Sequence, residues 1–169
     1  AEPLASIVET FKPGICVVHP YFGADLTDEE LQTIDFVKRK TGCIMVEDIT
    51  QCLFSSGGNE VFDVIIGSCR KWYPILDGAF LKQNSEILSL DFTEPEYPTN
   101  RNFLCTNYSA MFLLGLYRKT GYEAIKKISS KIGNISLSLT DGRIRLHKMS
   151  EYSLKLMCSS DSVEIKNRR

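Results

Sequence analysis

The sequence predicts an α/β fold built around a mostly parallel sheet, and three observations support this prediction. Short apolar runs rich in β-branched residues, which are typical of buried strands, occur at residues 15–19, 43–47 and 62–66. A segment with clear helix signals separates the first two runs. A strand–helix–strand unit makes a right-handed crossover and places its two strands parallel to each other. We therefore expect the three runs to lie in one mostly parallel sheet.

The first elements are marked clearly in the sequence. Residues 1–12 predict a helix, which the pair Pro13-Gly14 ends. Thr27 and Glu30 then fit a capping box, in which each side chain binds a backbone N–H of the other residue. An apolar stripe follows, and Gly42 is placed to end this helix. These signals predict a well-defined helix between the first two strands.

The remainder of the chain predicts a short strand and then mainly helices. The pair Asp77-Gly78 is typical of a turn, and residues 79–81 predict the start of another short strand after the run at 62–66. Residues 93–101, which contain two prolines, predict a surface connection. Helices are predicted at residues 107–120, 122–132 and 149–158, and from residue 161 onward. The pair Gly133-Asn134 is predicted to end the second of these helices.

Composition excludes several classes of protein. Of the 169 residues, 43% are hydrophobic and 24% are charged, which is usual for a globular domain with a core. The net charge of −1 gives no basic surface for nucleic acid. No apolar run approaches the length of a membrane span, and residues 1–11 lack the pattern of a signal peptide. The six cysteines have no C-x-x-C spacing and the two histidines no paired-ligand spacing, so we expect a cytoplasmic protein with reduced thiols and no metal.

Polar side chains follow the predicted strands at the points where these strands end. His19 ends the first strand, Asp48 ends the second, and Ser68 and Lys71 follow the third. Open α/β sheets bind their ligands at the carboxyl ends of the strands. Desolvation at this edge, beside Trp72, would leave the Lys71 amine neutral and nucleophilic toward a carbonyl. The alternative is that Lys71 simply extends into solvent, and that His19 is an ordinary hydrogen-bonded histidine at a strand end.

A carboxylate and a lysine at the ends of neighbouring strands suit a pyridoxal phosphate site. At this point the chain resembles the fold-type-I pyridoxal-phosphate aminotransferases, and most closely the sugar aminotransferases of the DegT/DnrJ/EryC1/StrS family. The matching pieces stand in the family's order and at roughly its spacing. They are VVHPYFG at 17–23, VEDITQ at 46–51, FDVIIGSCRKW at 62–72 and DGAFL at 77–81. A weaker match covers DGRIRLHKMSEYSLKLM at 141–157 and EIKNRR at 164–169.

The resemblance implies a role for each candidate residue. Lys71 would form the Schiff base with the cofactor aldehyde, and Asp48 would keep the pyridine nitrogen protonated. Gln51 would pack near the ring and its phenolic oxygen, or would be an ordinary loop amide. Ser68, three residues before Lys71, would contact the phosphate as in other fold-type-I aminotransferases, although in the sugar aminotransferases this serine lies farther from its lysine. Arg70 would add a phosphate contact or remain a solvated neighbour.

The resemblance also implies how the chain is organised. Residues 1–146 correspond to the second half of the large domain, which has three layers with helices on both faces of the sheet. Residues 147–169 correspond to helices that lead toward a small C-terminal domain. The rest of the site should then lie outside this chain, and the candidates here for the family's phosphate-binding asparagine are Arg143 and Arg145.

The activity that the resemblance implies is amino transfer from a small-molecule donor to a keto acceptor of sugar type. The resemblance implies a site at a twofold interface, and the apolar helix expected at 107–120 needs more cover than this chain supplies, so we expect a homodimer. Two alternatives remain open. The same cofactor could serve a dehydration or racemisation, or the chain could be a degenerate, non-catalytic module kept for its fold or its dimer surface.

Overall fold

The structure is a computed structural model that describes residues 2–54, 58–86, 97–140 and 146–167. The chain divides into two compact units, which are considered separately below. Unit 1 comprises Ala1–Pro74, Gly78–Leu90 and Ser159–Arg169, and unit 2 comprises Ile75–Asp77 and Asp91–Cys158. The predicted residues Arg143 and Arg145 lie outside the described part of the chain.

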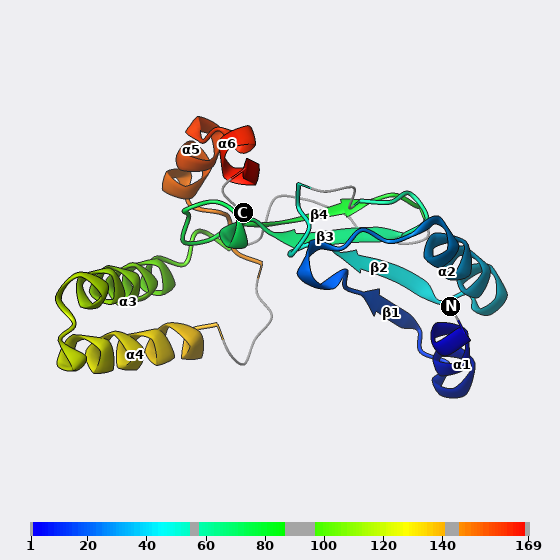
Figure 1. Ribbon diagram of the computed structural model, residues 1–169, viewed down its shortest axis with the longest axis horizontal. Helices are drawn as coiled ribbons and strands as arrows, with labels where there is room; N and C mark the ends of the chain where they lie inside the picture. Colours follow the sequence, from blue (N-terminus) through cyan, green and yellow to red (C-terminus); the bar gives the residue numbers. More distant parts are fainter. Residues whose placement is uncertain (1, 55–57, 87–96, 141–145, 168–169) are drawn as a thin grey trace. The chain divides into compact units, whose positions relative to one another are not determined.

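Unit 1 contains a four-stranded sheet in which the strands follow in the order of the sequence (Figure 1). The strands are β1 (Ile15–Val18), β2 (Ile44–Asp48), β3 (Val64–Ser68) and β4 (Ala79–Gln83). The pairs β1–β2 and β2–β3 are parallel, whereas β4 is antiparallel to β3. The α/β class and the placement of the three predicted strands in one mostly parallel sheet are therefore confirmed.

Two helices of unit 1 lie where the sequence predicts them, the first within one residue of its predicted bounds at each end. They are α1 (Glu2–Phe11) and α2 (Asp28–Thr41). The Glu30 backbone N–H donates to the Thr27 hydroxyl oxygen at 3.2 Å, and the Thr27 N–H donates to the Glu30 carboxylate at 2.8 Å. The Thr27 N–H and hydroxyl both donate to the Glu30 carboxylate and lower its pKa. Gly42 ends α2 in the left-handed conformation, with a φ of 69° that a residue with a side chain rarely adopts.

Loss of this cap has a measurable expected effect. We expect Thr27→Ala to lower the free energy of unfolding by about 1 kcal/mol, because the Glu30 N–H then loses its protein acceptor. Urea unfolding followed by circular dichroism would measure the change. Thr27→Ser keeps the hydroxyl and should stay close to the original stability. An alanine variant as stable as the original chain would contradict the capping role.

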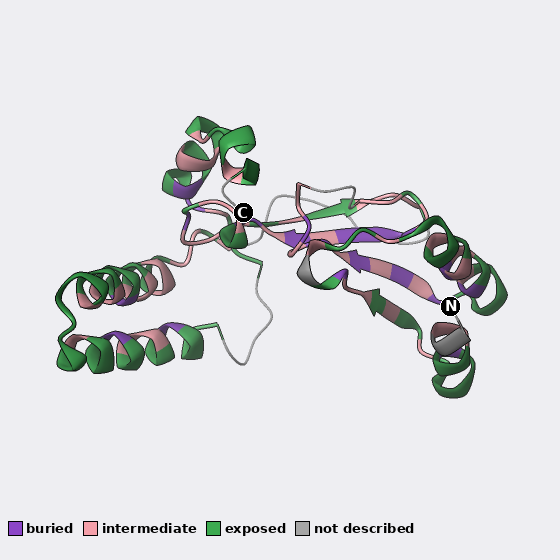
Figure 2. Ribbon diagram, viewed as in Figure 1, coloured by how far each residue is buried: buried purple, intermediate pink, exposed green. Residues whose placement is uncertain are grey.

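In the described part of unit 1, the main core cluster lies on one face of the sheet. Buried side chains of α1 and α2 pack there against those of the strands and of Phe62. On the other face, Ile15 and Val17 of β1 are each 59% exposed (Figure 2). The register pairs Ile15 with Ile44 and Val17 with Val46, so this exposed face is apolar across β1 and β2. Parallel sheets are normally covered on both faces.

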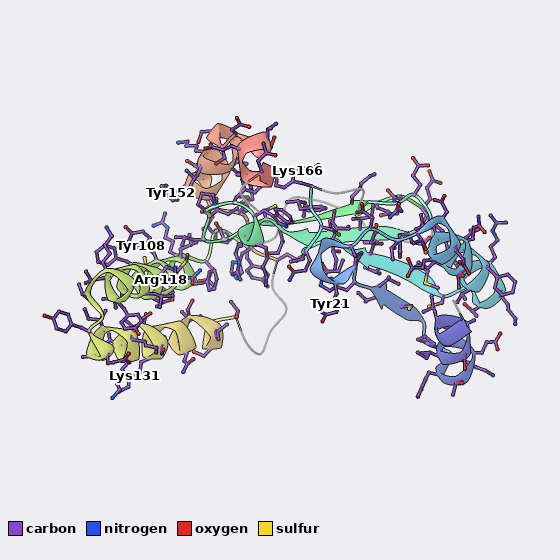
Figure 3. The ribbon with its side chains drawn as sticks, viewed as in Figure 1. Tyr21, Tyr108, Arg118, Lys131, Tyr152 and Lys166 are labelled. Atoms are coloured by element: carbon purple, nitrogen blue, oxygen red, sulfur yellow. The ribbon has the colours of Figure 1, made fainter. Side chains whose placement is uncertain are left out.

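Unit 2 is mainly helical and contains a hairpin of α3 (Arg101–Thr120) and α4 (Glu123–Ser138). Ser129 and Ala110 are buried between the two helices, where the serine hydroxyl donates to the alanine carbonyl at 2.8 Å. The outer sides of the hairpin are exposed. Tyr108 projects from α3 away from α4, and Lys131 from α4 away from α3 (Figure 3).

Two predicted helix bounds in unit 2 are wrong. The helix predicted from residue 107 begins at Arg101, because the Asn100 side chain accepts a hydrogen bond from the Phe103 N–H at 3.0 Å and caps it. The second helix does not stop at Gly133-Asn134 but continues to Ser138. Packing of α4 against α3 outweighs the roughly 1 kcal/mol that a glycine costs inside a helix.

The remaining helices are α5 (Glu151–Ser159) and α6 (Ser162–Asn167), both predicted. In unit 2, the Asp77 carboxylate accepts hydrogen bonds from the N–H and the hydroxyl of Ser150, each at 2.7 Å. Among the described helices, none combines the length and the apolar character needed to cross a membrane.

Candidate functional site

The predicted site residues lie at the carboxyl ends of adjacent strands in unit 1. Asp48 is the last residue of β2 and Ser68 is the last residue of β3. The register pairs Asp48 with Ile66, so Ser68 lies two residues farther along the neighbouring strand. His19 follows β1 directly. The topology therefore brings these residues to one edge of the sheet, where α/β folds bind ligands.

The Asp48 side chain is held from two sides. Its Oδ1 accepts a hydrogen bond from the Thr50 N–H at 2.9 Å. The Nδ1 atom of His19 lies 2.8 Å from the Asp48 carbonyl oxygen and 3.5 Å from the carboxylate Oδ2. A carbonyl oxygen only accepts hydrogen bonds, so this geometry requires a proton on Nδ1. The His19 ring packs edge-on against Tyr21 of the short helix η1 (Tyr21–Gly23), with the ring centroids 4.7 Å apart.

Asp48 thus combines a fixed orientation with access from outside. Its side chain is 29% exposed, so it is partly buried but can still be reached from solvent. His19 was expected to be an ordinary hydrogen-bonded histidine at a strand end. Its hydrogen-bond partner is the carbonyl oxygen of Asp48 itself. A carboxylate restrained in this way is suited to accept a hydrogen bond from a cationic N–H group.

Lys71 lies in a short helix, η2 (Cys69–Lys71), that follows β3 without a break. The Cys69 side chain is buried, and burial raises the pKa of its thiol, which disfavours the nucleophilic thiolate. Lys71 is exposed, which agrees with the second of the two interpretations above, that its side chain extends into solvent. Any desolvation of its amine must therefore come from a bound group or a covering segment.

An aromatic cluster supports the segment that carries Lys71. The indole N–H of Trp72 donates to the Thr50 carbonyl oxygen at 2.8 Å. The Phe54 ring packs edge-on against Trp72, with centroids 5.2 Å apart, and lies 5.8 Å from the Tyr73 ring. These contacts fix the chain on the carboxyl side of Lys71.

Gln51 lies in the turn after Asp48 and is half-buried. A Cβ atom at Gly23 would lie 3.2 Å from the Gln51 carbonyl oxygen, and Gly23 has a φ of 72°. A residue with a side chain would be strained there, so this glycine allows the loop after β1 to approach the loop after β2. The role of the Gln51 side chain remains a prediction.

Sequence reasoning missed Thr50. Its N–H binds Asp48, its carbonyl oxygen binds Trp72, and its hydroxyl oxygen accepts a hydrogen bond from the Ser68 N–H at 3.0 Å. The bond to Asp48 forms a turn in which the aspartate side chain accepts a hydrogen bond from the backbone N–H two residues later. The Asp-x-Thr order in the sequence is the available signal for this turn. The bonds to Ser68 and Trp72 depend on the fold and have no sequence signal.

The residues at this edge fit part of a pyridoxal phosphate site. The Asp48 carboxylate suits the ring N–H, and the Lys71 amine suits the aldehyde. Ser68 and Arg70 offer a hydroxyl and a guanidinium that suit a phosphate. In the described part of the chain, no group of three or more His, Cys, Asp or Glu side chains is placed to hold a metal ion.

Comparison with known proteins gave no match. No family model, no curated protein and no solved structure is significantly similar to this chain.

Proposed function

We propose that this chain belongs to a pyridoxal-phosphate-dependent aminotransferase that transfers an amino group from a small-molecule donor to a keto acceptor of sugar type. One observation carries the proposal. The Asp48 carboxylate, held by Thr50 and close to His19, lies at the end of β2, and the adjacent parallel strand β3 leads directly to Lys71.

When bound, the cofactor supplies an electron-accepting ring and an aldehyde that takes up the amino group. In this proposal Asp48 would accept the hydrogen bond of the ring nitrogen and favour its protonated form. Lys71 would hold the cofactor through its aldehyde and would also be the group that gives or takes a proton at the substrate. Ser68 would contact the phosphate, and Gln51 would pack near the ring.

The exposed features of unit 1 fit an enzyme with further parts. A third layer would cover the apolar face that contains Ile15 and Val17, and closure over the sheet edge would desolvate Lys71. We propose a homodimer in which the site is completed at the interface. The exposure of Lys71 also favours a second candidate, a non-catalytic module that keeps the fold without the chemistry.

Trapping with borohydride separates these two candidates. The full-length protein that the proposal implies is incubated with pyridoxal 5′-phosphate and reduced, and the labelled peptides are identified by mass spectrometry. We expect most of the label on Lys71, because the Asp48 carboxylate, the Ser68 hydroxyl and the Arg70 guanidinium at the same end of β2 and β3 together suit the cofactor. Lys82 of β4, which is also exposed, serves as the internal control.

Two variants sharpen this test. Lys71→Ala should remove the dominant label and leave the labelling of Lys82 unchanged. Lys82→Ala should leave the label on Lys71. Equal labelling of Lys71 and Lys82 in the unaltered full-length protein would contradict the proposed enzyme and favour the non-catalytic module.

A further inference from the structure

The backbone ladder between β2 and β3 ends in an unusual way. The Ile49 N–H donates to the Ile66 carbonyl oxygen at 2.9 Å, which continues the parallel pattern one residue beyond Asp48. In a regular parallel ladder, the Ser68 N–H would then donate to the Ile49 carbonyl oxygen. That oxygen instead accepts a hydrogen bond from the Cys52 N–H at 3.0 Å, because the chain turns after β2.

The Thr50 hydroxyl replaces the missing backbone acceptor. Its Oγ1 accepts the Ser68 N–H at 3.0 Å, so the ladder gains one more bond although β2 has already turned away. The backbone of the same residue binds the Asp48 carboxylate through its N–H and the Trp72 indole through its carbonyl oxygen. Thr50 therefore connects the end of β2 with the residues on both sides of η2.

We propose that Thr50 is a positioning residue that sets the placement of the Lys71 amine relative to the Asp48 carboxylate. This inference rests on the proposed function, in which both groups bind opposite ends of one rigid ring. Such a ring is held productively only when the two protein groups keep a fixed separation. The hydrogen bonds of Thr50 to Asp48, Ser68 and Trp72 supply that constraint across two strands.

The hydroxyl is the atom to test, because the backbone bonds of Thr50 survive a change of side chain. Thr50→Val has nearly the same shape but leaves the Ser68 N–H without its acceptor. Thr50→Ser keeps the acceptor and is the matched control. Both variants retain the N–H that binds Asp48.

The first measurement is amide hydrogen exchange in the full chain without cofactor. We expect the Ser68 amide to exchange about tenfold faster in Thr50→Val, as loss of one hydrogen bond allows. Exchange at Met45 near the start of β2 should stay unchanged, which would show that the fold is intact. Thr50→Ser should restore slow exchange at Ser68.

The second measurement is the borohydride trapping with pyridoxal 5′-phosphate, read as the ratio of label on Lys71 to label on Lys82. We expect this ratio to fall severalfold in Thr50→Val and to recover in Thr50→Ser. An unchanged ratio in Thr50→Val would overturn the positioning role while leaving the proposed function in place. A ratio near one in the unaltered chain would overturn the proposed function, and the positioning role with it.

Discussion

Asp48→Asn is expected to lower the rate of amino transfer by several powers of ten, with each tenfold loss equal to about 1.4 kcal/mol of transition-state free energy. The reason is chemical, because an amide cannot keep the pyridine nitrogen protonated as a carboxylate does. The fold should be preserved, since the asparagine oxygen can still accept the Thr50 N–H at this position. The rate is measured by spectrophotometry of the cofactor with an amino donor and a keto acceptor.

Trapping provides the control for Asp48→Asn. Lys71 should still be labelled in this variant, because the amine and its supporting segment are unchanged. Loss of turnover together with retained labelling would assign Asp48 to the chemistry. Turnover equal to that of the original protein would remove Asp48 from the proposed mechanism.

Asp63→Ala is expected to destabilise unit 1 by about 3–5 kcal/mol, as removal of one partner from a buried ion pair does. Asp63 is 1% exposed, and its carboxylate lies 2.9 Å from the Lys38 amine. It also accepts hydrogen bonds from the Met45 N–H at 3.0 Å and the Ser85 hydroxyl at 2.7 Å. Alanine leaves the Met45 N–H and the Ser85 hydroxyl without this acceptor, and the partly buried Lys38 ammonium loses its counter-charge although it keeps its bond to the Val61 carbonyl oxygen. Urea unfolding followed by Trp72 fluorescence reports on this unit.

The effect of Asp63 depends on pH in a defined direction. Burial alone would raise the pKa of Asp63, but the hydrogen bonds from Lys38, Met45 and Ser85 outweigh it and lower the pKa. The stabilisation is therefore complete above the pKa of an unfolded aspartate, about 3.9, and is lost as the pH falls through the lower folded value. The difference between the original chain and Asp63→Ala should shrink in acid.

A matched surface variant controls for the loss of charge. Asp35 forms an exposed ion pair with Arg39 one helical turn away. Asp35→Ala should change the free energy of unfolding by no more than about 0.5 kcal/mol. A similar effect of the two substitutions would contradict the structural role given to Asp63.

Much of unit 1 could be predicted because its signals are local. The cap of Thr27 and Glu30, the stop at Gly42 and the apolar strand runs each depend on residues close in sequence. The bounds of α3 and α4 could not be predicted fully. The continuation of α4 through Gly133 depends on packing against a second helix, which local propensity does not contain.

The positions of the candidate site residues could be predicted, but the hydrogen bonds that connect them could not. Strand order alone brings Asp48 and Ser68 to one edge of the sheet. The approach of His19 to Asp48 and the bond from Ser68 to the Thr50 hydroxyl depend on how the chain turns after each strand. The exposure of Lys71 was one of two interpretations that the sequence left open, because burial of a strand-end side chain depends on what covers it.

The one-sided core has a consequence for how the sheet tolerates sequence change. Side chains such as Met45 and Ile65 on the covered face are fully buried, so a change in their volume opens a cavity or causes a clash. Ile15 and Val17 on the opposite face touch water and contribute little to the stability of this chain. Polar residues at these two positions should therefore change the free energy of unfolding of unit 1 much less than changes at Met45 or Ile65.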